Sequence, residues 1–125
     1  MTAFHDLRVL VVEDEGAIAL LIEDMLLDLG CTIAASVGRL ADACEMARHG
    51  QYDFALLDVN LAGEVVTPVA DIVHERGIPF AFSTGYGSKG LPEKFTGHVV
   101  VAKPYLIADL ERAIGRALAQ PLTER

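Results

Sequence analysis

Four separated positions of the chain carry side chains that could accept or bind a phosphoryl group. Each position follows an apolar run, and together they supply three acids, a hydroxyl and a lysine: Glu13, Asp14, Asp58, Thr84 and Lys103. A carboxylate can attack phosphorus and form an acyl phosphate. Mg²⁺ prefers oxygen ligands and is commonly held by one or two carboxylates. A lysine ammonium and a hydroxyl can stabilise the charge on the transferred group, so these residue types predict phosphoryl transfer to a carboxylate.

Each of these residues also has a simpler explanation. Glu13 and Asp14 could cap a following helix, because acidic side chains are favourable at the positive end of the helix dipole. Thr84 could be an ordinary turn hydroxyl, and Lys103 could be an exposed surface charge. Asp58 resists such an explanation, because burying a carboxylate without a partner is costly. Taken together, the five residues favour one shared site.

The elements that must position these residues follow from the hydrophobic pattern. Short β-branched, apolar runs that are typical of buried strands cover residues 8–12, 32–37, 54–59, 78–83 and 99–102. Apolar stripes with helical spacing cover residues 18–29, 40–47, 69–73 and 107–118. This alternation predicts an α/β domain with a five-stranded, doubly wound parallel sheet. The carboxyl ends of parallel strands share one edge, so the acids, the hydroxyl and the lysine are expected to converge there.

The segment between the fourth and fifth predicted strands breaks the alternation. Residues 85–97 contain four glycines and one proline where a helix would be expected. In a helix interior, each Gly costs about 1 kcal/mol and each Pro about 3 kcal/mol relative to Ala. We therefore predict that the fourth helix is short or disordered, with at most a turn or two around residues 91–95.

Composition restricts the function. The 125 residues fit one domain, and a hydrophobic content of 52% allows a substantial core. A formal charge of −8 argues against binding to nucleic acid or to an anionic membrane surface. No apolar run approaches the roughly 20 residues that span a bilayer, and no signal peptide is visible. The two cysteines lack CxxC spacing and are typical of reduced thiols in a cytoplasmic protein, and the four histidines lack the spacing of metal ligands.

The sequence resembles the receiver domains of bacterial two-component response regulators, from residue 9 to about residue 118. Four motifs in the order and spacing of that family carry the resemblance: Val11-Val12-Glu13-Asp14-Glu15, Leu56-Leu57-Asp58-Val59-Asn60-Leu61, Ser83-Thr84-Gly85 and Lys103-Pro104-Tyr105. The resemblance implies a flavodoxin-like fold in a single receiver domain over residues 1–125, with no output domain.

The resemblance also implies a role for each site residue. Asp58 would be the phosphorylation site and would help to bind Mg²⁺. Asp14 would bind the metal directly and Glu13 more often through water. The main-chain carbonyl of Asn60 would be a further ligand.

The phosphate-binding and switching roles would fall to Thr84, which moves on activation, and to Lys103, which pairs with the phosphate. Most receivers carry Tyr or Phe three residues before this lysine, but here the position is Val100. Residues 82–87 instead resemble a subgroup with a Phe-Ala-Thr-Gly-aromatic-Gly motif, in which the fourth helix is short or disordered. We predict that Tyr86 is an alternative switch or shields the phosphoryl group; the alternative is a loop aromatic that packs on the surface.

The sequence therefore predicts a stand-alone phosphoacceptor of a two-component phosphorelay. It would take phosphate from a histidine kinase, of HWE type by the subgroup resemblance. It would then change its contacts with a downstream protein or phosphotransferase, or act as a phosphate sink. We expect no enzymatic activity beyond self-phosphorylation and autodephosphorylation. We also expect a monomer, because the usual dimer face of receivers includes the fourth helix.

Four other functions remain as alternatives. A haloacid-dehalogenase-like hydrolase would need a second acid where the chain has Asn60. A nucleotide or flavin binder would need a glycine-rich phosphate loop after the first strand, where the chain has Glu13, Asp14 and Glu15. The chain could also be a receiver fragment of a longer protein. A receiver that no longer accepts phosphate is disfavoured, because every member of the site is present.

Overall fold

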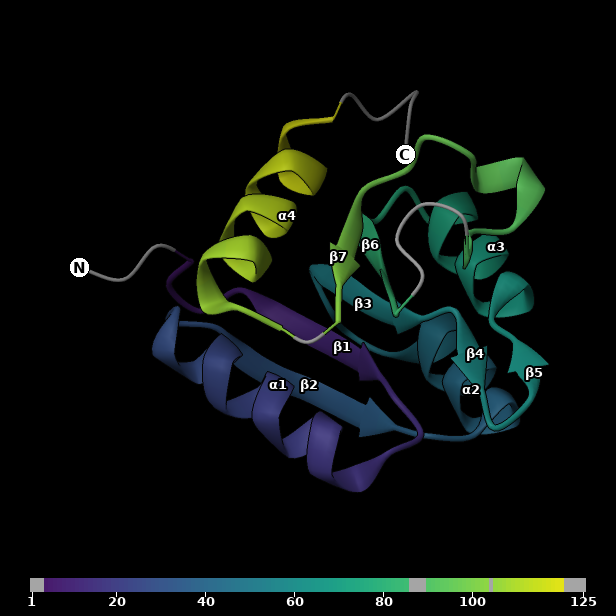
Figure 1. The fold of residues 1–125 in the computed structure, drawn as a ribbon, viewed down its shortest axis with the longest axis horizontal. Coiled ribbons are helices and arrows are strands. Elements are labelled where there is room, and N and C mark those ends of the chain that lie inside the picture. The colour runs from purple at the N-terminus through teal and green to yellow at the C-terminus, as the bar shows by residue number, and fades with distance from the viewer. Residues whose placement is uncertain (1–3, 86–89, 104, 121–125) are drawn as a thin grey trace.

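The computed structural model describes residues 4–85, 90–103 and 105–120. Five parallel strands form the central sheet (Figure 1): β1 (Arg8–Val12), β2 (Thr32–Val37), β3 (Phe54–Asp58), β6 (Phe80–Thr84) and β7 (Val100–Ala102). Their order is β2-β1-β3-β6-β7, so the chain starts near the middle and winds outward to both edges. This confirms the predicted doubly wound, flavodoxin-like sheet.

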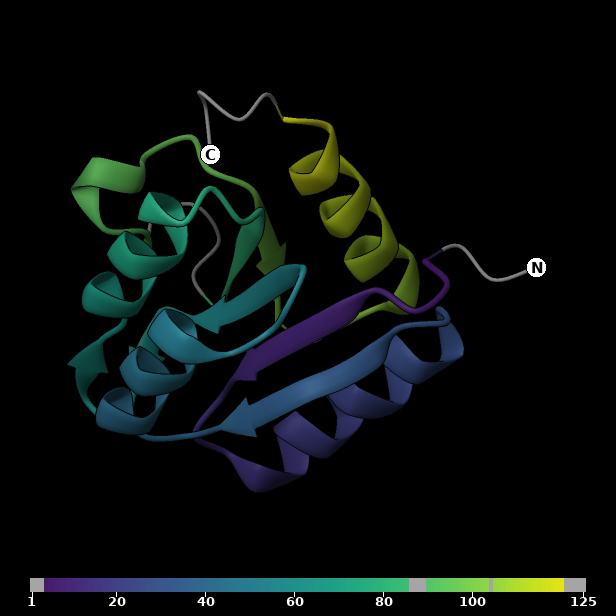
Figure 2. The same cartoon turned by 180° about the vertical axis from the view of Figure 1, so that it is seen from behind.

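Within the described residues, four α-helices cover the two faces of this sheet: α1 (Gly16–Asp28), α2 (Leu40–His49), α3 (Thr67–Glu75) and α4 (Ile107–Ala119). Helices α1 and α4 lie on one face, and α2 and α3 lie side by side on the other (Figures 1 and 2). Gly30 follows α1 with a φ of 92°, a value that glycine adopts without the Cβ penalty of other residues. Pro68 lies in the first turn of α3, where its missing N–H has no intrahelical partner to lose. None of the described helices is long and apolar enough to cross a membrane.

Two apolar clusters, one on each side of the sheet, form the core. Side chains along each strand point to alternate faces, so neighbouring residues of one strand join different clusters. In β1, Val9 and Val11 pack toward α1 and α4, whereas Leu10 and Val12 pack toward α2 and α3. Burying one such aliphatic side chain fully is worth about 1.5–3 kcal/mol. The central strands β1, β3 and β6, which lead into most of the site residues, are therefore almost fully buried.

The edge strand β2 differs from the prediction of a buried strand. Its residues alternate between exposed and half-buried, because β2 lies at the edge of the sheet and pairs with a neighbour on one side only. An apolar composition does not reveal whether a strand lies at the edge or at the centre. The prediction of a buried strand over residues 32–37 is therefore wrong in burial, although right in position.

A short antiparallel hairpin follows β3 and was not predicted from the sequence. Strands β4 (Asn60–Leu61) and β5 (Glu64–Val65) pair with each other, apart from the main sheet. Between β6 and β7, the described residues include a 3-10 turn at Glu93–Phe95. This agrees with the predicted shortening of the fourth helix. Tyr86, predicted as an alternative switch, lies outside the described residues.

Candidate phosphoacceptor site

The predicted site residues converge at the carboxyl edge of the sheet. Asp58 ends β3 and Thr84 ends β6, while Glu13 and Asp14 follow β1 directly. Lys103 follows β7, and its backbone N–H donates to the carbonyl of Thr84 at 3.1 Å. Because β1, β3, β6 and β7 are consecutive neighbours, their ends lie side by side. The convergence expected from the pattern is confirmed.

Lys103 bridges two buried acids. Its Nζ lies 3.0 Å from Oε1 of Glu13 and 3.2 Å from Oδ2 of Asp58. The Glu13 and Asp58 side chains are only 1% and 8% exposed, so neither could stay ionised cheaply without a partner. Burial lowers the pKa of Lys103, but the hydrogen bond and charge of Glu13, together with Asp58, outweigh it and hold that pKa above its ordinary value. Lys103 is therefore a charge partner inside the site and not an isolated surface lysine.

The site carries more negative than positive charge. The pKa of Asp58 is raised to about 7, first by burial and then by the hydrogen bond and charge of Glu13, and Lys103 offsets this only in part. With Asp14 included, three carboxylates face one ammonium at this edge. Such an imbalance favours a further cation, because like charges in close contact destabilise one another.

Glu13, Asp14 and Asp58 each have one carboxylate oxygen that lies within 4.8 Å of the other two. Mg²⁺ holds its ligands at about 2.1 Å, so two oxygens on opposite sides of one ion are about 4.2 Å apart. The cluster therefore needs only small side-chain movements, or one bridging water, to surround such an ion. A donor set of oxygens alone suits Mg²⁺ better than a softer metal.

Glu13 and Asp14 do not simply cap α1. Glu13 directs Oε2 to the backbone N–H of Glu15, at 3.1 Å, while its Oε1 pairs with Lys103. Asp14 directs Oδ2 to the backbone N–H of Ala62 in the β4–β5 hairpin, at 3.0 Å. The N-cap residue of α1 makes no side-chain capping hydrogen bond. Glu13 thus contacts groups at the carboxyl edge of the sheet, and Asp14 contacts the hairpin beside that edge.

An open cavity of about 670 Å³ lies above Asp58. Its lining combines the predicted site with residues from the loops that follow β3 and β6: Asp14, Glu15, Asp58, Val59, Asn60, Val65, Thr84, Gly85, Gly90 and Lys103. Val65 contributes an apolar wall and is 52% exposed. Thr84, which lines the same cavity, is buried. The cavity is large enough for a phosphoryl group with its donor.

A pair of buried hydroxyls beneath the cavity was missed in the sequence. Ser83 and Tyr105 are both buried and share a hydrogen bond between their hydroxyl groups. Burial, followed by the charges of Glu13 and Asp58, raises the pKa of Tyr105. The available signal was a coincidence of two polar residues: Ser where the subgroup motif has Ala, and Tyr two positions after Lys103.

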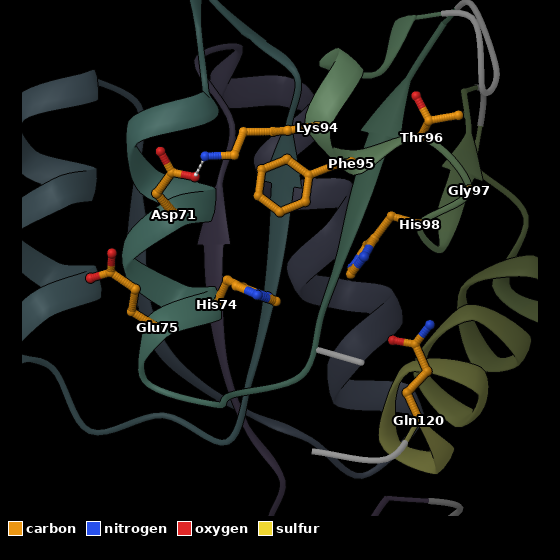
Figure 3. A pocket seen from close by; sticks show the side chains of 9 residues that line it. All are labelled: Asp71, His74, Glu75, Lys94, Phe95, Thr96, Gly97, His98 and Gln120. Carbon is orange, nitrogen blue, oxygen red and sulfur yellow. Dashed lines mark ion pairs between the residues drawn. The ribbon is translucent and has the colours of Figure 1, made fainter. Parts of the chain in front are cut away.

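A second cavity, of about 380 Å³, contains none of the predicted site residues (Figure 3). It lies beside α3 and the segment that leads into β7, at the edge of the sheet opposite Asp58. His98 stacks on Phe80, with ring centroids 4.1 Å apart, and its Nε2 lies 2.8 Å from the Phe80 carbonyl oxygen. Lys94 forms an ion pair with Asp71 at 2.8 Å. His98 is therefore a partly buried, structural histidine.

No protein-family model and no curated protein match the chain, whereas solved structures do. Among solved structures, SdrG from Sphingomonas melonis Fr1 is 37% identical, with a TM-score of 0.81 over 95% of this chain and 100% of that one. The receiver domain of the response regulator PhyR from Erythrobacter litoralis is 28% identical, with a TM-score of 0.79 over 95% of this chain and 97% of that one.

A third structure agrees in fold. The receiver domain of the sensor histidine kinase PA1611 from Pseudomonas aeruginosa PAO1 is 24% identical, with a TM-score of 0.77 over 92% of this chain and 99% of that one. That structure has a magnesium ion in its active-site cleft. The SdrG match spans nearly all of both chains, and the architecture and the convergent strand ends are those expected of a receiver. The chain belongs to the receiver-domain family of two-component response regulators.

Proposed function

We propose that this receiver accepts a phosphoryl group on Asp58. A carboxylate oxygen of Asp58 attacks phosphorus, the bond from phosphorus to the leaving group breaks, and an aspartyl phosphate results. The observation that carries this proposal is the position of Asp58: a buried carboxylate at the base of an open cavity, bridged by Lys103 to Glu13. Burial keeps the nucleophile in one orientation, and the cavity gives a phosphodonor access to it.

Lys103 and Thr84 would bind the transferred group. The Lys103 ammonium already lies 3.2 Å from the Asp58 oxygen, so it would also lie close to a phosphoryl group on that oxygen. Thr84 lines the same cavity and has a hydroxyl that can donate to a phosphoryl oxygen. Thr84 ends β6, the neighbour of β3, and Lys103 follows β7, the neighbour of β6. This order of strands fixes the distance of both side chains to Asp58.

Glu13, Asp14, Asp58 and the main-chain carbonyl of Asn60 would hold Mg²⁺. The clustered carboxylate oxygens and the excess of negative charge support this assignment. When bound, Mg²⁺ supplies positive charge that offsets the acids and the incoming phosphoryl group. The magnesium ion in the cleft of the PA1611 receiver is consistent with the same choice of metal.

The partners follow from this chemistry and from the family. A histidine kinase, of HWE type by the subgroup resemblance, would donate the phosphoryl group, and a downstream protein or phosphotransferase would receive the signal or the phosphate. We further propose that this receiver is monomeric and cytoplasmic and turns over no other substrate. The formal charge of −8 supports protein partners over nucleic acid.

A hydrolase of the haloacid-dehalogenase type finds no support in the geometry. Its second acid would occupy the position of Asn60, whose side chain is an amide and cannot act as a general acid. The Asn60 Oδ1 instead accepts a hydrogen bond from the backbone N–H of Gly63 at 2.8 Å. The phosphoryl group on Asp58 would therefore lack the group that turns it over rapidly.

Intact-mass measurement after incubation with acetyl phosphate tests the proposal. The wild type should gain one phosphoryl group with Mg²⁺ and lose the gain when EDTA is added beforehand. Asp58→Asn should gain none. Asp71→Asn is a matched control, because Asp71 is also an ion-paired aspartate but lines the opposite cavity. Equal labelling of wild type and Asp58→Asn would reject the proposal.

A further inference from the structure

The β4–β5 hairpin is a compact arm between β3 and α3 (Figure 1). Asn60 pairs with Val65 and Leu61 with Glu64, and the backbone N–H of Val66 closes the base by donating to the Val59 carbonyl at 2.9 Å. Leu61 is buried in the core on the α2 and α3 side, which anchors the arm. The hairpin is therefore an ordered part of the fold.

The turn of the hairpin depends on an unusual backbone conformation. Ala62 and Gly63 have φ values of 50° and 92°, so both central residues are in the left-handed region. Two such residues give the type of two-residue turn that matches the twist of a hairpin. Gly63 adopts this conformation freely, whereas Ala62 adopts it against the preference of its Cβ. The hairpin contacts must hold Ala62 in place.

The same turn holds a carboxylate of the site. The backbone N–H of Ala62 donates to Oδ2 of Asp14 at 3.0 Å, across 48 positions of sequence. Asp14 itself is exposed, and an exposed aspartate would otherwise populate several rotamers. An ionised carboxylate has two oxygens and about four acceptor sites, so this hydrogen bond leaves Asp14 able to bind a cation.

The hairpin also carries a second group of the site. Asn60 begins β4, and its side-chain Oδ1 accepts from the backbone N–H of Gly63 at 2.8 Å. The Asn60 side chain thus braces the turn from within. Its main-chain carbonyl is the atom that the proposed function assigns to the metal. One small arm therefore orients Asp14 and carries Asn60.

We infer that the Ala62–Gly63 turn is a positioning element for the Mg²⁺ site, acting through Asp14 and Asn60. This inference rests on the metal site of the proposed function. It assigns a positioning role to Ala62 and Gly63, which are not themselves among the metal ligands. Ligands that are held in place before binding lose less freedom when the cation arrives, which raises affinity. Removing groups that orient metal ligands typically weakens metal binding 10- to 100-fold.

Gly63→Val tests the turn, and Gly97→Val is its matched control. Gly63 and Gly97 have φ values of 92° and 86°, and a Cβ at either position would meet no atom within 4 Å. Valine is therefore disfavoured at both positions by backbone conformation alone. Gly97 lines the opposite cavity, far along the chain from the hairpin. Thermal unfolding should show a similar loss of stability in both variants.

Mg²⁺ affinity, measured by calorimetric titration of the full chain, should separate the two variants. We expect the dissociation constant of Gly63→Val to rise about 10-fold, as for other lost ligand-orienting contacts, and that of Gly97→Val to stay at the wild-type value. An unchanged or tighter affinity in Gly63→Val, with wild type binding normally, overturns the inference alone. If wild type itself binds no Mg²⁺, the proposed metal site fails and the inference fails with it.

Asn60→Ala provides a second test if Gly63→Val does not fold. This change removes the brace on the Gly63 N–H but keeps the main-chain carbonyl and every carboxylate of the site. Asn60 is exposed, so the variant should fold. Weaker Mg²⁺ binding by several-fold supports the inference, because no ligating atom is lost. Wild-type affinity in this variant contradicts it.

Discussion

The Lys103 ammonium lies 3.0 Å from the Glu13 carboxylate and 3.2 Å from that of Asp58, so one cation bridges acids at the ends of two neighbouring strands. The bridge brings together side chains that are 45 or more positions apart in sequence. It also leaves the site with a deficit of positive charge, since Asp58 keeps a pKa of about 7 in the presence of Lys103. The arrangement is thus suited to receive a divalent cation.

Lys103→Met should destabilise the protein at pH 7.5. Removing one partner of a buried ion pair costs about 3–5 kcal/mol, and we expect about 2 kcal/mol here because Lys103 is partly exposed. Asp58 would lose its cation, so its pKa, already raised to about 7 in the wild type, would rise further. Protonation would then relieve the repulsion, and the loss should shrink at pH 5. Urea unfolding of wild type and variant at the two pH values measures the loss of stability. A larger loss at pH 5 than at pH 7.5 would contradict the role of Lys103 as the charge partner of Glu13 and Asp58.

The Ser83–Tyr105 hydroxyl pair should show thermodynamic coupling. Tyr105→Phe or Ser83→Ala alone leaves one buried hydroxyl without its partner, at about 1–2 kcal/mol each. The double variant removes both hydroxyls, so its loss should be clearly smaller than the sum of the single losses. Urea unfolding of the four proteins gives the coupling energy.

Tyr52→Phe is the control for that cycle. The Tyr52 hydroxyl is also buried, but it donates to the Ala47 carbonyl at 2.7 Å on the other side of the sheet. Its effect should add to that of Ser83→Ala within about 0.5 kcal/mol. Additive effects in the Ser83 and Tyr105 pair would mean that these hydroxyls do not stabilise each other.

His98 should make stability depend on pH. Burial, opposed by the hydrogen bond with the Phe80 carbonyl, holds the pKa of His98 below its ordinary value of 6.5, and His74 adds to the lowering. Between the folded and unfolded pKa values, the unfolded chain binds more protons. The stabilisation by neutral His98 is therefore complete above pH 6.5 and is lost as the pH falls through the folded pKa.

Unfolding free energies of wild type and His98→Phe at pH 7.5 and pH 5.5 test this dependence. Phenylalanine keeps the ring that stacks on Phe80 but cannot titrate. The advantage of wild type over the variant should shrink at pH 5.5. His49→Gln, at an exposed position of α2, serves as the control. An advantage that stays constant between the two pH values would show that His98 does not titrate in this range.

The central part of the site could be predicted because parallel strands all end at one edge. The apolar runs before Asp58, Thr84 and Lys103 were long and β-branched enough to be recognised, so their last residues could be placed together. Gly30 after α1 and Pro68 in the first turn of α3 likewise follow from local steric preferences. These features depend only on neighbours in sequence.

The hairpin and the hydroxyl pair depend on contacts that local patterns do not contain. Strands β4 and β5 have two residues each, too short for a periodic signal. Ala62 has a left-handed φ that its residue type disfavours and that the contact with Asp14 helps to hold. The Ser83–Tyr105 contact requires the register between β6 and the segment after β7. Tyr86 stays a prediction, for which loop chemical shifts in Tyr86→Ala, with and without a phosphoryl mimic, are the test.

The most direct measurement of the central claim is the chemical identity of the phosphorylated residue. Borohydride reduces an aspartyl phosphate to homoserine, so treatment after acetyl phosphate and Mg²⁺ marks the acceptor permanently. Peptide mass spectrometry should find homoserine in place of Asp58, only in samples that received the phosphodonor. Homoserine at another aspartate, with residue 58 unchanged, would contradict the assignment of Asp58 as the phosphoacceptor.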